Sequence, residues 1–283
     1  MKCFYHDDMD GRCAGSIVSR YEKDVQKQNF FEVDYIMDLP LNCIKENERV
    51  YLVDYSFKKD TIWQLEKILE KTKDVIWIDH HTSSINVEKE LPWTKEINGI
   101  RREGISGAKL TYIFCANVEE DNVPYAVELV SDYDCWIYKF DPDTTYFKIG
   151  IETKNYDALD RVWYDLYDTS NPKTDKIIKI GKTIKSYIDK DNDSYRESFA
   201  YESEIEGHKC LVVNKKSNSW IFGKKYDEYP IVMPWVFNGE KYIYSIFSSN
   251  PNVDCSKIAE KYGGGGHKGA AGFVSDELLF KKV

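Results

Sequence analysis

The sequence predicts an α/β protein with a parallel-sheet N-terminal domain, a helical linker and a smaller mixed-sheet α/β C-terminal domain. Within residues 2–78, short apolar runs with strand-favouring residues alternate with helical patterns, which is typical of βαβ units and a parallel sheet. Beyond residue 200 the pattern alternates like a sheet and contains one short helix. Between these parts, residues 174–199 read as one long polar helix. We therefore expect domains at 1–173 and 200–283 and a linker helix at 174–199.

Composition restricts the class of protein. The chain has 283 residues, 42% of them hydrophobic, and a formal net charge of -9. Proteins that grip long nucleic acids usually present a broad basic surface, so this acidic balance argues against a long duplex partner. No apolar run approaches the roughly 20 residues of a membrane span. The seven cysteines contain no C-x-x-C pair and read as reduced thiols. We expect a soluble cytoplasmic protein without a signal peptide.

The first strand is expected at residues 2–5, and metal-competent side chains follow it directly. His6, Asp8, Asp10 and Gly11 form an acidic turn, and helical spacing then continues to Tyr21. In an extended turn, two aspartates two residues apart can point the same way. A helix cap would explain one of the aspartates but neither His6 nor the second carboxylate.

Three further strands are expected at 31–36, 50–53 and 74–78, with a helix at 58–71 before the last of them. The strand at 50–53 ends in Asp54, and the strand at 74–78 ends in Asp79-His80-His81. Right-handed crossovers place the carboxyl ends of parallel strands at one edge of a sheet. The polar residues that follow these strands are therefore expected to meet there.

The middle of the chain predicts two more helices. Residues 104–108 open the first, and Ser106 fits either an N-cap or an anion site at the helix start. The second, at 123–131, leads into an acidic cluster at 131–136. Residues 140–173 show interrupted helical patterning, and the sequence assigns no role to them.

The C-terminal part predicts strands at 209–214, 231–237 and 241–247 and a helix at 254–262. A glycine run with His267 and Lys268 follows. Glycine runs are common in flexible linkers. Here the run lies between a helix and an apolar segment, so we favour a loop whose backbone N–H groups approach a phosphate or nucleotide.

Together these motifs resemble the DHH phosphoesterase family with its DHH-associated C-terminal domain, and in particular the oligoribonuclease and dinucleotide phosphodiesterase members. The resemblance rests on His6 to Gly11, Val53-Asp54, Asp79-His80-His81, Ser131-Asp132, and Gly264-Gly265-Gly266-His267 with Ala270-Ala271-Gly272. It implies an N-terminal domain that holds two divalent metals, usually Mn²⁺ with Mg²⁺ or Co²⁺ as alternatives, and a smaller substrate-binding domain.

The resemblance also implies residue roles. The implied metal ligands are His6, Asp8, Asp10, Asp54, His80 and Asp132, with Asp54 as the bridging carboxylate. The implied catalytic residues are His81, which faces the phosphate, and Asp54. The implied substrate-binding residues are Gly264, Gly265, Gly266, His267 and Lys268, to which we add Ser106 from its helix start. The chain departs from some members in two places: a single residue separates His6 from Asp8, and Phe247-Ser248 stands where an Arg-Ser pair is frequent.

The chemistry follows from the residue types. Converging carboxylates repel strongly unless cations separate them, and mixed carboxylate and imidazole ligands suit manganese. Two such metals can activate a water for direct attack on a phosphate ester, so no serine or cysteine nucleophile is required. His81 would offset charge on the phosphoryl oxygens.

The favoured function is therefore hydrolysis of short oligonucleotides, or of linear or cyclic dinucleotides, to mononucleotides. A RecJ-like single-strand exonuclease would need a basic track with stacking aromatics, and no basic track is evident. Polyphosphate or pyrophosphate hydrolysis fits the metal site but not the Gly-Gly-Gly-His segment. A nucleotide-binding regulator with an inactive site fits poorly with a near-complete ligand set. The resemblance leaves a homodimer open.

Overall fold

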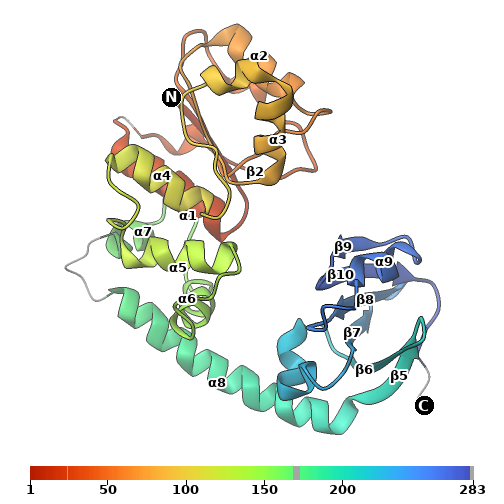
Figure 1. The fold of residues 1–283 in the computed structure, drawn as a ribbon. Coiled ribbons are helices and arrows are strands. Elements are labelled where there is room, and N and C mark those ends of the chain that lie inside the picture. Colours follow the sequence, from red (N-terminus) through yellow and green to blue (C-terminus); the bar gives the residue numbers. More distant parts are fainter. Residues whose placement is uncertain (24, 168–172, 281–283) are drawn as a thin grey trace. The chain divides into compact units, whose positions relative to one another are not determined.

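The structure, a computed structural model, describes residues 1–23, 25–167 and 173–280. It divides the chain into two compact units, Met1–Ile184 and Lys185–Val283 (Figure 1). The division falls within the long helix α8 (Lys173–Phe199), which covers the whole expected linker helix and begins one residue before it. The domain limits expected from the sequence remain a prediction. In the described part of the chain, no helix combines the length and the apolar composition that a membrane crossing requires.

The first unit is built on a parallel sheet, as predicted. Within the described residues the sheet has four strands in the order β2-β1-β3-β4, and every neighbouring pair is parallel. The chain crosses from β1 to β2 on one side and then returns to place β3 on the other side of β1. Such a reversal opens a crevice beyond the carboxyl ends of the two strands. The strands are β1 (Lys2–His6), β2 (Phe30–Val33), β3 (Val50–Val53) and β4 (Val75–Ile78).

Helices cover both faces of this sheet. Alternate side chains of a strand serve different faces, so Tyr5 packs in one core cluster and Phe4 in the other. This explains why β3 and β4 are apolar at every position. On the Tyr5 face, α1 (Met9–Tyr21) and α4 (Gly107–Ala116) contact the strands, and α5 (Tyr125–Asp134), α6 (Asp143–Ile151) and α7 (Arg161–Leu166) extend the same core cluster. On the Phe4 face, α2 (Trp63–Lys71) and α3 (Thr82–Glu90) complete the other cluster.

Some expected boundaries were wrong, and local hydrogen bonds explain one of them. The second strand ends at Val33 and not at residue 36, because the Asp34 carboxylate accepts bonds from the N–H groups of Ile36 and Met37 (2.8 and 3.2 Å) and closes a turn. Helix α2 begins at Trp63 and not at residue 58. The segment 140–173 contains α6 and α7, and its residues 168–172 lie outside the described part.

The second unit has the mixed sheet that the sequence predicted. Its six described strands have the order β5-β6-β7-β8-β10-β9, and β6 and β7 form the parallel pair. Helix α9 (Cys255–Glu260) covers one face, and the turn η4 (Ser219–Tyr226) covers the other. The strands are β5 (Tyr201–Ile205), β6 (His208–Asn214), β7 (Ile231–Phe237), β8 (Tyr242–Phe247), β9 (Gly265–His267) and β10 (Ala270–Ser275). The first unit also contains three shorter 3₁₀ turns, η1 (Lys27–Asn29), η2 (Leu41–Cys43) and η3 (Pro92–Glu96).

The glycine run is a strand and not the expected loop. Residues Gly265–His267 pair antiparallel with β10 at the edge of the sheet. A Cβ atom on Gly264 would lie 2.2 Å from the carbonyl oxygen of Gly272, and one on Gly266 would lie 2.5 Å from the Cα of Ala271. A Cβ atom on Gly265 would meet nothing within 4 Å. Packing against β10 thus accounts for two of the glycines but not for Gly265.

Candidate metal centre

The corner between β1 and α1 places His6 and Asp8 side by side. Strand β1 ends at His6, and Asp8 is the N-cap of α1. Asp8 Oδ1 accepts a bond from the N–H of Gly11 (2.9 Å), and Asp8 Oδ2 lies 2.8 Å from His6 Nδ1. A Cβ atom on Gly11 would lie 2.2 Å from the carbonyl oxygen of His6, so a glycine is needed for α1 to start this close to the strand. Asp8 therefore both caps the helix and faces His6.

Asp54, directly after β3, lies at the centre of the cluster. Its side chain is 1% exposed, and its φ of 53° is uncommon for a residue other than glycine. The backbone N–H of Asp54 donates to the carbonyl of Ile78 (2.9 Å), which fixes the residue against β4. A Cβ atom on Gly107, at the start of α4, would lie 2.6 Å from the Cβ of Asp54. The helix start therefore fits against Asp54 only because residue 107 has no side chain.

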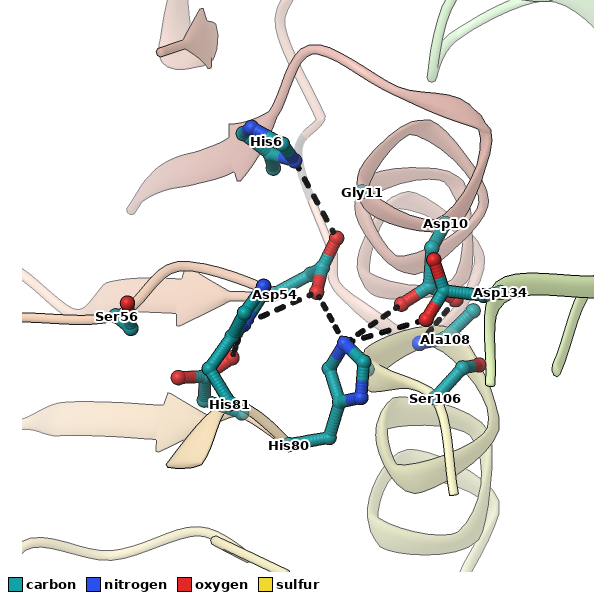
Figure 2. A network of polar contacts seen from close by, with 12 residues as sticks. His6, Asp10, Gly11, Asp54, Ser56, His80, His81, Ser106, Ala108 and Asp134 are labelled. Carbon is teal, nitrogen blue, oxygen red and sulfur yellow. Dashed lines mark hydrogen bonds and ion pairs between the residues drawn. The ribbon is translucent and has the colours of Figure 1, made fainter. Parts of the chain in front are cut away.

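His80 connects the carboxylates of the cluster (Figure 2). Its Nε2 lies 3.3 Å from Asp54 Oδ1, 3.3 Å from Asp134 Oδ2 and 3.9 Å from Asp10 Oδ2. Asp10 lies in the first turn of α1 after β1, Asp54 follows β3, and His80 follows β4. Asp134 is the last residue of α5. The structure thus brings together, at one edge of the sheet, side chains that are distant in the sequence.

Asp10 is held by the first turn of α4. It is 1% exposed, and its Oδ1 accepts a bond from the N–H of Ala108 (3.1 Å). The hydroxyl of Ser106 also hydrogen-bonds to Asp10. Ser106 is completely buried and caps α4, accepting from the N–H of Lys109 (3.3 Å). The Ser106 hydroxyl therefore positions Asp10, and the substrate-binding role expected for Ser106 remains a prediction.

Asp79 orients His81. Asp79 is fully buried, and its Oδ1 lies 2.8 Å from His81 Nδ1. The hydroxyl of Ser84 donates to the other oxygen of Asp79. A carboxylate that holds one nitrogen of an imidazole fixes the ring and leaves the other nitrogen free for chemistry. In His81 that free nitrogen is Nε2. Sequence reasoning missed this orienting role of Asp79.

Asp132 does not join the cluster. Its carboxylate accepts bonds from the N–H groups of Lys139 (2.8 Å) and Phe140 (3.0 Å) and from the hydroxyl of Thr144. Asp134, two residues later, lies beside His80. Residues two apart on a helix point in nearly opposite directions. Asp132, the ligand expected from the sequence, therefore lies outside the cluster, and we propose Asp134 as a ligand in its place.

Burial and mutual repulsion disfavour the charged form of three carboxylates. The pKa of Asp54 is raised well above its ordinary value by burial and then by Asp10 and the other carboxylates nearby. Burial, followed by the charges of Asp10 and Asp8, raises the pKa of Asp134 to about 8. Burial likewise raises the pKa of Asp10. Burial would also raise the pKa of Asp8, but its hydrogen bonds with His6 and Gly11 lower it overall.

The pKa values of His6 and His81 are raised, whereas burial alone would lower them. Burial lowers the pKa of His6, but the hydrogen bond and charge of Asp8 raise it overall. Burial lowers the pKa of His81, but the hydrogen bond and charge of Asp79, together with the charges of Asp134 and Asp10, raise it overall. Each ring is thus tuned by the carboxylate beside it.

The donor set fits divalent cations. Four buried carboxylate oxygens find no hydrogen-bond donor within the described residues: Asp10 Oδ2, both oxygens of Asp54, and Asp134 Oδ2. Buried polar atoms without partners are costly, and bound cations would satisfy these oxygens. Three groups of residues each offer ligand atoms that lie within 4.8 Å of one another inside the group. The groups are His6, Asp8 and Asp54; Asp54, His80 and His81; and His80, Asp134 and Cys135. Asp54 takes part in two groups, so the residues fit two cations that share it.

A comparison with protein families identifies the N-terminal part of the chain. Residues 3–132 match the family model described as the DHH family, N-terminal domain. These residues form a DHH-family N-terminal domain. The sheet and the cluster just described, apart from Asp134, lie within this DHH domain.

The relatives extend the similarity to nearly the whole chain. An uncharacterized protein of Acanthamoeba polyphaga mimivirus is 23% identical over 279 residues, which cover 93% of this chain. The chain spans 60% of the length of that relative. The DHH domain of a member of the s1p family of ribosomal proteins has a TM-score of 0.60 at 13% identity, covering 96% of this chain and 82% of that one. The pGpG-specific phosphodiesterase PggH from Vibrio cholerae has a TM-score of 0.56 at 11% identity, covering 98% of this chain and 94% of that one. These likenesses confirm the fold.

Tyr35 lies at the rim of the DHH-domain cluster and was missed by sequence reasoning. Its ring centroid lies 5.1 Å from that of His6 and 6.4 Å from that of His81. It stacks on Tyr55 at 5.0 Å, and its hydroxyl accepts a bond from the N–H of Ser56 (3.2 Å). The residue lies in the turn after β2, where no periodicity or motif signals a site.

The expected substrate-binding residues of the second unit lie together on and beside the edge strand β9. His267 and Lys268 are exposed there, and Gly265 is open to solvent. Ser248, which stands in the frequent Arg-Ser position, is buried and donates its hydroxyl to the carbonyl of Pro230 (2.6 Å). Substrate binding by Gly264, Gly265, Gly266, His267 and Lys268 remains a prediction.

Proposed function

We propose that this protein is a metal-dependent phosphodiesterase that hydrolyses short oligonucleotides, or linear or cyclic dinucleotides, to mononucleotides. One observation carries the proposal: among the described residues, four buried carboxylate oxygens lack hydrogen-bond donors, and three of them lie within 3.9 Å of His80 Nε2 beyond the carboxyl ends of the parallel strands. A set of repelling carboxylates is unfavourable for folding unless cations bind there. The cluster is therefore best explained as a site kept for its chemistry.

The ligand groups support an assignment to two ions. Asp54 would be shared, His6 and Asp8 would complete one site, and Asp10, His80 and Asp134 the other. Mixed carboxylate and imidazole ligands suit Mn²⁺, and Mg²⁺ or Co²⁺ are the alternatives. Cys135 lies within reach of the second group, but burial raises the pKa of its thiol to about 12, so it is a poor source of thiolate.

The protein residues would then position the phosphate and supply a proton. Two bound divalent ions would lower the pKa of a water towards about 7 and offset phosphoryl charge. Asp79 holds His81 through Nδ1, so a protonated His81 would present the proton on its Nε2 to the substrate. That proton would be donated to a phosphoryl oxygen. Ser106 and Ala108 keep Asp10 in place during this step.

Two observations support a small nucleotide substrate. The formal charge of -9 disfavours the broad phosphate contacts that long nucleic acids require. The structural neighbour PggH is described as specific for pGpG, a dinucleotide. In the second unit, the open backbone at Gly265 and the exposed His267 offer donors for a phosphate or sugar.

A substrate panel tests the proposal. The manganese-loaded full chain is incubated with linear and cyclic dinucleotides, longer single strands and polyphosphate, and the products are separated. We expect mononucleotides from dinucleotides at the highest kcat/KM. The matched control is Asp54→Asn, which keeps the shape of the side chain and should be inactive. Faster cleavage of long strands would favour an exonuclease, phosphate from polyphosphate alone would favour a polyphosphatase, and nucleotide binding without turnover would indicate an inactive regulator.

A further inference from the structure

A tryptophan stands in solvent two residues beyond the metal cluster. Trp136 is 74% exposed and follows Asp134 and Cys135 at the end of α5. Ile137, next to it, is 54% exposed. Within the described part of the chain, the ring of Trp136 meets that of Tyr138 edge-on, with the ring centroids 6.3 Å apart. The large apolar face of the indole is therefore left uncovered, two residues along the chain from Asp134 of the cluster.

The backbone of this turn is in a conformation that a tryptophan adopts rarely. Trp136 has a φ of 56°, and Tyr138 has a φ of 52°. For bulky residues a positive φ is an outlier, and such strained residues cluster at active sites and ligand-binding sites. Glycine would satisfy this backbone better, so the indole itself is the feature to be explained.

Asp132 fixes the turn in this shape. Its carbonyl accepts from the N–H of Ile137 (3.0 Å), and its carboxylate accepts from the N–H groups of Lys139 and Phe140. The turn is therefore held from within by hydrogen bonds and does not depend on the indole for its shape. Asp132 thus acts as a positioning residue for the exposed tryptophan.

The position of the indole indicates what would cover it. A nucleobase is joined to its phosphate through a single sugar, and Trp136 lies two residues from a ligand of the proposed phosphate site. Stacking of a base on an aromatic face is strong and tolerates any base. The exposed Lys139 in the same turn adds positive charge for an anionic ligand.

We propose that Trp136 is a stacking platform for a nucleobase of the substrate whose phosphate lies at the Asp54–Asp134 cluster. This inference rests on the proposed function, because it places a nucleotide at that site. It assigns recognition of the base to the first unit of the chain.

Binding measurements with the manganese-loaded full chain test the platform. Calorimetry compares adenosine 5′-monophosphate with ribose 5-phosphate, which lacks the base. The variants are Trp136→Gly, which relieves the backbone and removes the indole, and Trp136→Phe, which keeps an aromatic face. Trp63→Ala removes another exposed tryptophan (42% exposed), which lies on α2 over the opposite sheet face, and serves as the control.

We expect wild type and Trp63→Ala to bind the nucleotide more tightly than the sugar phosphate. Trp136→Gly should lose most of this preference, on the order of tenfold in nucleotide affinity, while its affinity for ribose 5-phosphate stays unchanged. Its melting temperature should stay equal or rise, and Trp136→Phe should restore much of the preference. An equal loss for both ligands, no loss, or a lower melting temperature would overturn the platform. So would a changed sedimentation coefficient with unchanged base preference, which would indicate a contact between protein chains.

The two proposals fail separately. If the wild type prefers the nucleotide through Trp136 but hydrolyses no phosphate ester, the phosphodiesterase proposal fails and the platform stands. If dinucleotides are hydrolysed and Trp136→Gly leaves kcat/KM unchanged, the platform fails and the phosphodiesterase proposal stands.

Discussion

Asp132 and Asp134 lie two residues apart at the end of α5, and their carboxylates belong to different networks. Asp134 Oδ2 lies 3.3 Å from His80 Nε2, whereas both oxygens of Asp132 accept hydrogen bonds from the turn that follows the helix. One helix end therefore supplies a candidate metal ligand and, on its other side, the anchor of a loop. The two residues can be separated by substitution.

Exchange of Asp134 for asparagine should remove an ion, whereas the same exchange at Asp132 should cost stability. For Asp134→Asn we expect about one ion fewer per chain and a loss of turnover greater than the roughly 10- to 100-fold that follows loss of a residue behind a ligand. For Asp132→Asn we expect both ions to remain and the free energy of unfolding to fall by about 1–3 kcal/mol, because buried backbone donors lose a charged acceptor. Metal analysis and urea unfolding measure these effects. Loss of the ion in Asp132→Asn alone would restore the assignment made from the sequence.

Asp54→Asn should make the metal-free protein more stable while abolishing turnover. The carboxylate is buried, and its pKa is raised well above the ordinary value by burial and neighbouring carboxylates, so removing its charge relieves a cost. We expect a gain of about 1 kcal/mol or more in the free energy of unfolding in the presence of a chelator. Asp54→Ala is the informative companion, because alanine at a φ of 53° loses about 1–2 kcal/mol that asparagine avoids. A less stable metal-free Asp54→Asn would show that the carboxylate is already well satisfied.

The stability of the metal-free protein should fall as pH rises from about 4 to about 8. Aspartates in the unfolded chain titrate near 3.9, while burial and neighbouring carboxylates raise the pKa of Asp134 to about 8 in the folded protein and raise that of Asp54 as well. The folded state therefore holds protons that the unfolded state releases, and unfolding becomes more favourable with rising pH across this window. The raised pKa of His6 and of His81 acts in the same direction. Urea unfolding with chelator at several pH values measures the slope, and saturating Mn²⁺ should remove it. A flat or rising profile without metal would contradict the assignment.

Gly265→Ala should leave the fold intact and weaken substrate binding. A Cβ atom there meets nothing within 4 Å, so a loss of affinity would report close approach of a ligand to the backbone. Gly264→Ala is the contrasting variant, since its Cβ atom would lie 2.2 Å from the carbonyl oxygen of Gly272 and should disturb the edge of the sheet. We expect a several-fold higher KM for dinucleotides in Gly265→Ala at an unchanged melting temperature. An unchanged KM would remove this strand from the substrate site.

The strand ends were predictable from the sequence because each is marked locally. An apolar run that stops at a histidine or an aspartate indicates both a buried strand and its carboxyl end, and parallel topology then brings His6, Asp54 and His80 together. The structure places these residues as expected, and their roles as ligands remain predictions.

The errors arose where tertiary packing decides the outcome. Which side of α5 faces the cluster depends on how the helix lies on its neighbours, so the sequence could not separate Asp132 from Asp134. The glycine run becomes a strand through pairing with β10, which is not visible in the run itself. Tyr35 and Trp136 lie in turns and carry no periodic signal, and the left-handed backbone of Trp136 can be read only from coordinates.

The candidate metal ligands His80, Asp10, Asp54 and Asp134 follow three different strands or end a helix, and they are neighbours only in the folded chain. An ion bound there would therefore tie distant segments to one another and draw the folding equilibrium towards the native state. In its absence the same residues would be the weakest part of the first unit. The supply of metal would then govern how long each molecule survives proteolysis, in addition to whether it is active.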